Sequence, residues 1–284
     1  MAEVAQQEKI ENIYYPLPAR VTEIIDETST IKTYKFQMDE PFEFKAGQFV
    51  QLTIPGIGEA PFTPSSKPGI SPELEITILK TGRVTDYLHD RIDEGALLGI
   101  RGPFGKGYPM DKMKGHEVLV VGGGVGLAPL RSCLYALFDN IDEYKHISIK
   151  YGARTPNDLV FKYQFEEWEK MPKTDLKLTI DKAHPRWSGS VGVVTCLLDK
   201  ENGLDVNIED TYVVCCGPEI MLKFVTFKLV DIGFSPERIY LSMNRRMSCG
   251  VGMCHRCNIG PYYLCKDGPD MCYAKIKDYP NVFS

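Results

Sequence analysis

Five of the nine cysteines of this 284-residue chain lie between Met247 and Tyr273, and no other feature constrains the fold as much. Four of them have the form C-x4-C-x2-C followed by a later cysteine, namely Cys249, Cys254, Cys257 and Cys265. This is the ligand spacing of a plant-type [2Fe-2S] cluster. Two irons bridged by sulfide need four thiolates around one small object, so the first three must come from a single tightly turning loop. The spacing therefore predicts an iron–sulfur centre near the end of the chain.

The residues between these cysteines suit such a loop. Gly250 and Gly252 tolerate backbone dihedrals that a side chain forbids. Gly-Pro steps at 260–261 and 268–269 turn the chain, and a short strand is expected at 262–264 between them. The fourth cysteine can then return to the first three.

Two other interpretations of the cysteines compete with a cluster. A zinc site of four cysteines usually has two C-x2-C pairs, and only one such pair is present. Disulfides are typical of secreted chains, but the polar, acidic N-terminus does not resemble a signal peptide. Cys272 could replace Cys265 as the fourth ligand, and the spacing alone leaves that choice open.

Composition narrows the class of protein. A chain of this length is expected to form about two domains, each with its own core. The net charge of -5 offers no basic surface, so nucleic acid is not expected as a partner. No stretch approaches the length of apolar sequence that a membrane span needs. Nine cysteines in such a chain indicate a reducing, cytoplasmic setting.

Two sequence patterns divide the chain. From residue 19 to about 109, short β-rich runs alternate with Gly and Pro, which predicts a small antiparallel β-barrel with one helix at about 84–91. From residue 117, strands alternate with helices, which predicts a doubly wound parallel sheet. The expected parts are a flexible arm (1–17), an all-β barrel domain (18–112), an α/β nucleotide domain (113–243) and a small C-terminal cluster module (244–284).

In the α/β part, strands are expected at 118–121, 147–151, 176–180, 212–216 and 239–241, with helices at 157–170 and 219–232. The first strand runs into GGGVG at 122–126 and then into a helix that starts at about Leu127. Bare amides and the positive end of a helix dipole would meet a pyrophosphate there, at the carboxyl end of the strand. Gly123, Gly124 and Gly126 are the candidate phosphate contacts. Because the spacing is not G-x-G-x-x-G, a turn without a ligand stays open.

A second motif follows the fourth of these strands, at the same edge of the expected sheet: Cys216, Gly217, Pro218 and Met221. Together with the glycine loop it outlines one cleft, in which Cys216 would border the reacting ring. Arg154, after the second strand, could hold the ribose of an adenosine. A packing cysteine, a helix-starting proline and a solvated arginine are the alternatives.

Two motifs of the barrel suit a flavin. Pro61, Phe62, Thr63 and Ser65 place a ring and hydroxyls at the end of a strand, and a flavin needs an apolar surface and a donor near N5. The alternative is a plain proline-rich turn.

The other barrel motif consists of Gly82, Arg83, Val84 and Thr85, which open the helix expected there. A helix N-terminus with a hydroxyl suits a second pyrophosphate. An N-capping threonine would look the same.

Taken in order, the barrel, P-F-T, G-x-V-T, R-G-P-x-G, GGGVG-x-A-P and C-G-P-x-x-M resemble the ferredoxin–NADP reductase superfamily over roughly residues 18–245. With its tail, the chain is most similar to gamma subunits of cytoplasmic hydrogenase/sulfur reductases and to the B-type subunit of anaerobic sulfite reductase. The electron-transfer subunit of dihydroorotate dehydrogenase is a more distant relative. These proteins carry R-R-M-x-C-G-x-G-x-C-x-x-C and C-x-D-G-P, which here begin at Arg245 and Cys265.

This resemblance implies FAD on the barrel, NAD(H) or NADP(H) on the parallel sheet and a [2Fe-2S] cluster in the tail. It implies that Thr63 bonds the flavin near N5, that Cys216 flanks the nicotinamide, and that Cys265 rather than Cys272 is the fourth ligand. The implied function is an NAD(P)H-linked electron-transfer (diaphorase) subunit of a cytoplasmic hetero-oligomer. Its partners would be a hydrogenase, a sulfur, sulfite or disulfide reductase, or ferredoxin.

The chain departs from the superfamily at a few positions. Ala60 replaces the arginine that commonly neutralises the flavin phosphate, and Arg83 or Arg101 are the candidates to take its place. His255 and Arg256 stand in the cluster loop where relatives often have Gly and His, and are expected to tune its potential or partner contacts.

Two rival functions stay open at this stage. One is a self-contained reductase that serves a diffusible acceptor, and the other is a zinc-stabilised, nucleotide-binding regulator without redox chemistry. The choice between NAD and NADP is also open, although Arg154 slightly favours a 2′-phosphate.

Overall fold

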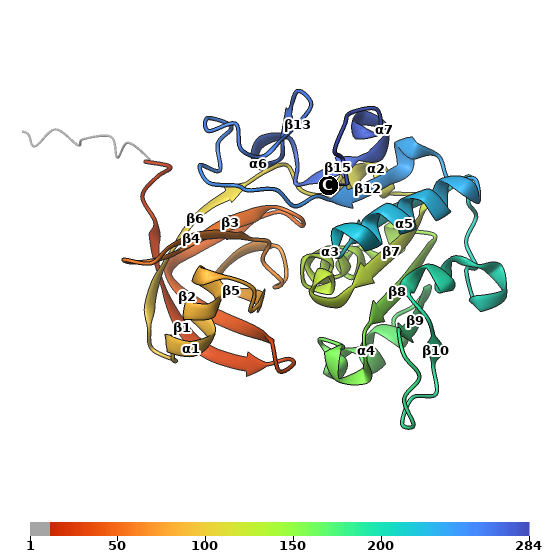
Figure 1. The fold of residues 1–284 in the computed structure, drawn as a ribbon, viewed down its shortest axis with the longest axis horizontal. Helices are drawn as coiled ribbons and strands as arrows, with labels where there is room; N and C mark the ends of the chain where they lie inside the picture. Colours follow the sequence, from red (N-terminus) through yellow and green to blue (C-terminus); the bar gives the residue numbers. More distant parts are fainter. Residues whose placement is uncertain (1–11, 284) are drawn as a thin grey trace, which may run out of the picture.

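The computed structural model describes residues 12–283, and Figure 1 shows two β-sheets side by side with the C-terminal segment packed along both. The first sheet is antiparallel, with the strand order β4-β3-β6-β1-β2-β5. Its elements are β1 (Leu17–Asp26), β2 (Ile31–Phe44), β3 (Phe49–Ile54), β4 (Gly58–Phe62), β5 (Gly69–Leu79), α1 (Arg83–Arg91) and β6 (Leu97–Phe104). The strands alternate buried and exposed residues, as in β2, and the buried faces enclose one core that includes Tyr34, Phe36 and Leu52.

The second sheet has the strand order β10-β9-β8-β7-β11-β12-β15 and is parallel except at β15. Before the C-terminal segment it contains α2 (Met110–Met113), β7 (Glu117–Gly123), α3 (Leu127–Asp139), β8 (His146–Ala153), α4 (Phe165–Glu169), β9 (Thr174–Ile180), β10 (Ser190–Val191), β11 (Thr211–Cys216), α5 (Glu219–Asp231) and β12 (Ile239–Ser242). Successive residues of β7 face opposite sides of the sheet. Val118 and Val120 join the core that includes residues of α3, whereas Leu119 and Val121 join the core that includes residues of α5. Helices therefore cover both faces, as a doubly wound sheet requires.

The C-terminal segment is hydrogen-bonded into this second sheet. It comprises β13 (Asn258–Ile259), β14 (Tyr262–Tyr263), α6 (Leu264–Asp267), β15 (Asp270–Cys272) and α7 (Tyr273–Ile276). β15 pairs antiparallel with β12, so that Ser242 lies opposite Asp270, and the amide of Met243 donates to the carbonyl of Pro269 at 3.0 Å. The cysteine-rich segment is thus fixed against the edge of the parallel sheet.

A buried polar network joins the two sheets. Arg131 of α3 donates to Glu75 of β5 at 2.5 Å and to Gln164 at 2.6 Å, and its guanidinium lies 4.4 Å from the ring centroid of Phe161. Glu27 of the barrel half accepts a hydrogen bond from the Phe161 amide at 2.9 Å. These contacts hold the ends of β2 and β5 next to the carboxyl edge of the parallel sheet.

The predicted antiparallel barrel and doubly wound parallel sheet are confirmed, but the helix predicted at 157–170 is wrong except for α4. Phe161 adopts a φ of 55°, which a helix cannot accommodate, while its amide serves Glu27. Most of the predicted flexible arm at 1–17 lies outside the described residues. Between residues 12 and 283, no helix has both the length and the apolar character that crossing a membrane requires.

Candidate functional site

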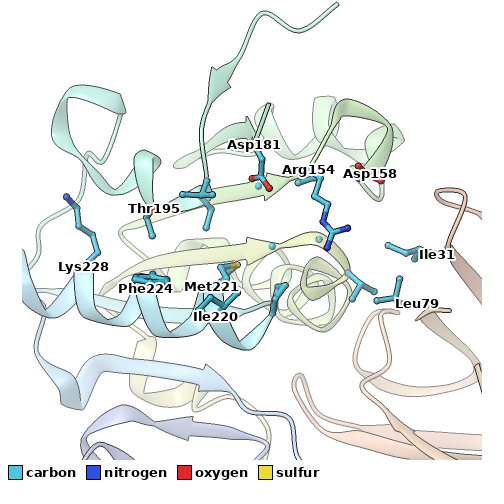
Figure 2. A pocket seen from close by; sticks show the side chains of 18 of the residues that line it. Ile31, Leu79, Arg154, Asp158, Asp181, Thr195, Ile220, Met221, Phe224 and Lys228 are labelled. Atoms are coloured by element: carbon cyan, nitrogen blue, oxygen red, sulfur yellow. The ribbon is translucent and has the colours of Figure 1, made fainter. Parts of the chain in front are cut away.

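A cavity of about 1100 Å³ lies at the carboxyl ends of β7, β8 and β9, between this edge and α5 (Figure 2). Its walls combine the glycine loop, the start of α5 and the barrel residues Ile31 and Leu79, so both halves of the chain line it. In Figure 2, Ile220, Met221 and Phe224 line the cavity from α5, and Arg154 and Asp181 enter it from the opposite wall. Carboxyl ends of parallel strands are where nucleotides bind in such sheets.

The two motifs predicted to outline one cleft are in direct contact. A Cβ at Gly126 would lie 2.3 Å from the carbonyl oxygen of Cys216, and a Cβ at Gly123 would lie 2.1 Å from the sulfur of Met221. Only glycine allows these approaches. Gly124, at φ +54°, has no atom within 4 Å on its Cβ side and lines the cavity, so its backbone is open to a ligand.

Gly126→Ala is expected to lower the free energy of unfolding by about 1–3 kcal/mol, the usual cost of overpacking, because a backbone carbonyl cannot give way like a flexible side chain. The comparison is Gly124→Ala, whose methyl group meets open space and costs only about 1–2 kcal/mol for its left-handed backbone. Thermal unfolding checks both. Nucleotide binding should also weaken in Gly126→Ala, since Cys216 must move, and unchanged unfolding and binding would contradict this packing.

The far end of the cavity carries charged side chains. Arg154 lines it, and among the described residues its guanidinium has no hydrogen bond or ion pair. Asp158 accepts a hydrogen bond from Thr155 at 2.7 Å, and Asp181 also lines the wall. A free guanidinium beside carboxylates can bind phosphate or ribose oxygens.

The flavin motif of the barrel lies outside the lining of this cavity. Pro61 and Phe62 end β4 and are half-buried, as is Thr63, so their surfaces are accessible. Ser65 is fully buried and hydrogen-bonded to Thr77 at 2.9 Å, which leaves its hydroxyl engaged within the protein.

The start of α1 shows that the threonine caps the helix. The hydroxyl of Thr85 accepts hydrogen bonds from the amides of Thr81 and Gly82 at 2.8 and 2.9 Å. Gly82 and Arg83 are exposed and Val84 is half-buried, so the amides of Arg83 and Val84 remain at an accessible helix N-terminus.

Of the two arginines considered as substitutes at the flavin phosphate, Arg101 is already engaged. It is 4% exposed and bonds both carboxylate oxygens of Glu59, at 2.9 and 2.7 Å. This hydrogen bonding lowers the pKa of Glu59, so the pair stays charged at neutral pH. Arg83, which is exposed, remains the available cation.

The four predicted cluster cysteines come together as two pairs. The thiols of Cys249 and Cys254 are within hydrogen-bonding reach of one another, as are those of Cys257 and Cys265. The sulfur of Cys249 accepts from the amides of Val251 and Met253 at 3.4 and 3.3 Å, and that of Cys265 from Gly252 at 3.1 Å. Such amide-to-sulfur bonds tune iron–sulfur centres, and two thiolates for each of two irons is the donor set that a [2Fe-2S] cluster needs.

The thiol environments differ between the pairs. Burial opposes ionisation of Cys249, but the amides around it lower its pKa to about 6. Burial and the neighbouring Cys257 raise the pKa of Cys265 to about 12. In residues 12–283 no group of three or more Cys, His, Asp or Glu side chains is arranged to hold a metal ion. The fit to a cluster therefore rests on the two pairs and their amides.

Cys272 lies apart from these pairs. Its thiol faces the carbonyls of Pro236 and Glu237, at 3.6 and 3.4 Å. This position agrees with the prediction that it is a bystander.

Sequence reasoning missed a polar group next to Cys216. Burial raises the pKa of the Cys216 thiol to about 12, so it stays neutral, and the thiol lies within hydrogen-bonding reach of Ser242. Ser242 in turn contacts Tyr108 at 2.7 Å and donates to Asp270. The available signal was Asp270 itself, a carboxylate in the otherwise apolar strand β15.

Three family models match the chain in sequence. The oxidoreductase FAD-binding domain matches residues 18–108, the oxidoreductase NAD-binding domain matches residues 120–226, and the iron–sulfur cluster binding domain of dihydroorotate dehydrogenase B matches residues 244–277. The predicted cofactor types, FAD, NAD and an iron–sulfur cluster, are thereby confirmed.

Curated relatives match over nearly the whole length. The sulfhydrogenase 2 subunit gamma of Pyrococcus furiosus is 38% identical over 92% of this chain and 96% of its own length. A probable dihydroorotate dehydrogenase B (NAD(+)) electron transfer subunit of Methanocaldococcus jannaschii is 34% identical over 92% of this chain and 91% of its own. A solved structure of an NADH-dependent reduced ferredoxin–NADP oxidoreductase shares the fold, with a TM-score of 0.73 and 24% identity over 91% of each chain. The chain therefore belongs to the oxidoreductase family of FAD-, NAD- and iron–sulfur-binding proteins that includes the sulfhydrogenase gamma subunits and the electron transfer subunits of dihydroorotate dehydrogenase B.

Proposed function

We propose that this chain is the NAD(P)H-linked electron-transfer subunit of a cytoplasmic redox complex, in which electrons pass between nicotinamide, FAD, a [2Fe-2S] cluster and a partner subunit. The observation that carries the proposal is the pairing of β15 with β12. It ties the cysteine-rich segment to the sheet edge that ends at Cys216, so that a cluster and a nicotinamide site share one structural unit. The sequence divisions at 18–112, 113–243 and 244–284 would then hold FAD, nucleotide and cluster in turn.

Each motif has a role in this proposal. The bound FAD would supply the conversion between a two-electron hydride and single electrons. Thr63 would donate a hydrogen bond near flavin N5, with the ring on Pro61 and Phe62 and with Ser65 supporting the turn. The amides and charge at Gly82, Arg83, Val84 and Thr85 would hold the flavin phosphates.

The parallel-sheet motifs would hold the second nucleotide. Gly123, Gly124 and Gly126 would bind its diphosphate, and Arg154 its adenosine end. Gly217, Pro218 and Met221 would shape the nicotinamide site, where the neutral Cys216 thiol excludes water beside the reacting ring. Cys249, Cys254, Cys257 and Cys265 would hold the iron.

The cluster loop also supports a protein partner. Cys254, Met253 and His255 are exposed, so one of the proposed ligands lies at the surface. A surface ligand shortens the path to another protein. We infer a hetero-oligomer with a hydrogenase, a sulfur, sulfite or disulfide reductase, or a ferredoxin-linked protein. All nine cysteines are free thiols, which supports a reducing cytoplasm.

Anaerobic purification from native extract tests the function. We expect flavin and iron–sulfur absorption that bleaches with NADH or NADPH, about two irons per chain, and copurifying redox subunits. A colourless, zinc-containing protein would establish the regulator instead. A monomer with full turnover towards a diffusible acceptor would establish the self-contained reductase.

Replacing Arg154 by alanine is expected to raise the Kd of the nucleotide about tenfold, about 1.4 kcal/mol, because the cavity loses an unpaired guanidinium. Lys182→Ala removes an exposed cation beside the cavity and should leave the Kd unchanged. Titration with NADH and NADPH separates two contacts. A larger loss for NADPH places the guanidinium at the 2′-phosphate, equal losses place it at the diphosphate or ribose, and no loss for either contradicts the role.

A further inference from the structure

A buried carboxyl group lies where the barrel, the parallel sheet and the C-terminal segment meet. Asp270 is 7% exposed, and the hydroxyl of Ser242 donates a hydrogen bond to its Oδ1. The other oxygen, Oδ2, is buried without a hydrogen-bond partner among the described residues. A Cβ at Gly47 would lie 2.1 Å from Oδ2, so the backbone of the barrel closes over it. A buried oxygen of this kind is costly as an anion and much less so when protonated.

The groups around Asp270 do not neutralise its charge. It faces Tyr108 from the β6–α2 connection, Ser242 from β12, and the thiols of Cys216 and Cys133 from β11 and α3. Lys106, the cation of the adjoining loop, pairs with Asp267 at 3.5 Å. Burial raises the pKa of Asp270 to about 7, although hydrogen bonds from Ser242 and Tyr108 lower it.

The position of Asp270 connects the two proposed redox sites. It begins β15, shortly after Cys265, so it belongs to the cluster segment. Through Ser242 it also reaches the thiol of Cys216, the residue proposed to flank the nicotinamide. Added negative charge on either side would act on this carboxyl through a poorly polarisable interior.

We propose that Oδ2 of Asp270 binds a proton when electrons arrive at the flavin and the iron–sulfur centre, and releases it when they leave. This inference rests on the proposed function, since it needs both centres. Electrons from NAD(P)H add negative charge, and the carboxylate takes one proton from water and forms one O–H bond. When the electrons pass to the partner, that bond breaks and the proton returns to water. No other bond of the chain changes.

The test uses the anaerobic holoprotein and its Asp270→Asn variant. The midpoint potential of the cluster is measured by EPR-monitored titration between about pH 6 and pH 8, which brackets the pKa of about 7. We expect the wild-type potential to fall as pH rises and the variant potential to stay constant, because an amide binds no proton in this range. Reduced-minus-oxidised infrared spectra should show a carboxylic acid band that Asp270→Asn lacks, which a merely structural role would not produce.

Asp267→Asn is the matched control. It removes one negative charge from the same segment, but this carboxylate is paired with Lys106 and partly exposed, so the pH slope and the infrared band should persist. Ser242→Ala keeps the carboxyl and removes a donor to its anion, so the pH at which the slope changes should rise, even where Asp270→Asn folds poorly.

The outcomes separate the two proposals. A protein with both centres overturns only this inference when its cluster potential is independent of pH, or when Asp270→Asn keeps the wild-type slope and band. A protein that carries neither flavin nor iron, measured before any titration, overturns the proposed function and this inference together.

Discussion

Replacing Cys265 by serine is expected to remove the iron–sulfur centre while leaving the flavin in place. Cys265 lies in the second thiol pair with Cys257 and accepts an amide bond from Gly252, so its loss leaves one proposed iron without its pair of ligands. Iron content should fall from about two per chain to near zero. The barrel, which carries the proposed flavin contacts, has its own core and should be unaffected.

The kinetic consequence separates two steps. NADH should still bleach the flavin, because the nucleotide cavity and Cys216 do not depend on the thiol pairs. Transfer onward to a one-electron acceptor should fall more than about tenfold, since changes even outside the ligand shell cost 10–100-fold. Stopped-flow absorption follows the first step, and reduction of a one-electron dye or of the copurified partner follows the second.

Cys272→Ser is the matched control, because Cys272 lies in the same segment but its thiol faces Pro236 and Glu237. It should keep iron, the EPR signal and onward transfer. The reverse pattern, with iron lost in Cys272→Ser and kept in Cys265→Ser, would show that Cys272 is the fourth ligand.

Local sequence signals predicted the fold well where the determining contacts are close in sequence. The glycine loop at 122–126 must bring a strand into a helix, and the structure ends β7 at Gly123 and begins α3 at Leu127. The cysteine loop likewise carries its own glycines, Gly250 and Gly252, both at positive φ. Such turns depend on dihedral preferences that single residues determine.

Contacts between distant segments were not predictable in this way. Nothing near Asp270 indicates that β15 pairs with β12 or that its carboxyl meets Ser242. Arg101 was a candidate for the flavin phosphate because its charge is visible in the sequence, but its partner Glu59 becomes apparent only when β4, β3 and β6 lie side by side. The helix predicted at 157–170 is interrupted for the same reason, since Phe161 serves Glu27 of the other half. These outcomes depend on tertiary contacts that override local propensity.

Asp175→Asn is expected to destabilise the chain by about 3–5 kcal/mol near neutral pH, because it leaves a buried ammonium group without its counter-ion. The Lys150 side chain is fully buried in β8, and its Nζ donates to Asp175 at 2.6 Å and to the carbonyl of Gly203 at 2.9 Å. His146 also faces Asp175, at 3.3 Å, but it is partly exposed and can be hydrated when the carboxylate is lost.

The pH dependence identifies the cause of this loss. Burial lowers the pKa of Lys150 in the folded chain below its ordinary value of 10.5, despite the hydrogen bond and charge of Asp175. Between the lowered value and 10.5 the unfolded chain binds more protons, so stability rises with pH across this window. Without the carboxylate the folded pKa falls further, and the window should widen towards neutral pH in Asp175→Asn.

The double variant Lys150→Met/Asp175→Asn provides the control, since it removes both charges and keeps an apolar chain of similar length. It should recover most of the lost stability and lose the rise with pH, as followed by denaturant unfolding at several pH values. Equal stability of the single and double variants would show that the ammonium is not the source of the cost. Because β8 continues from Lys150 to Gly152 in the cavity wall, recovery in the double variant should also restore nucleotide binding. Recovery of both would show that the lysine–aspartate pair supports the nucleotide site only through the stability of its strand.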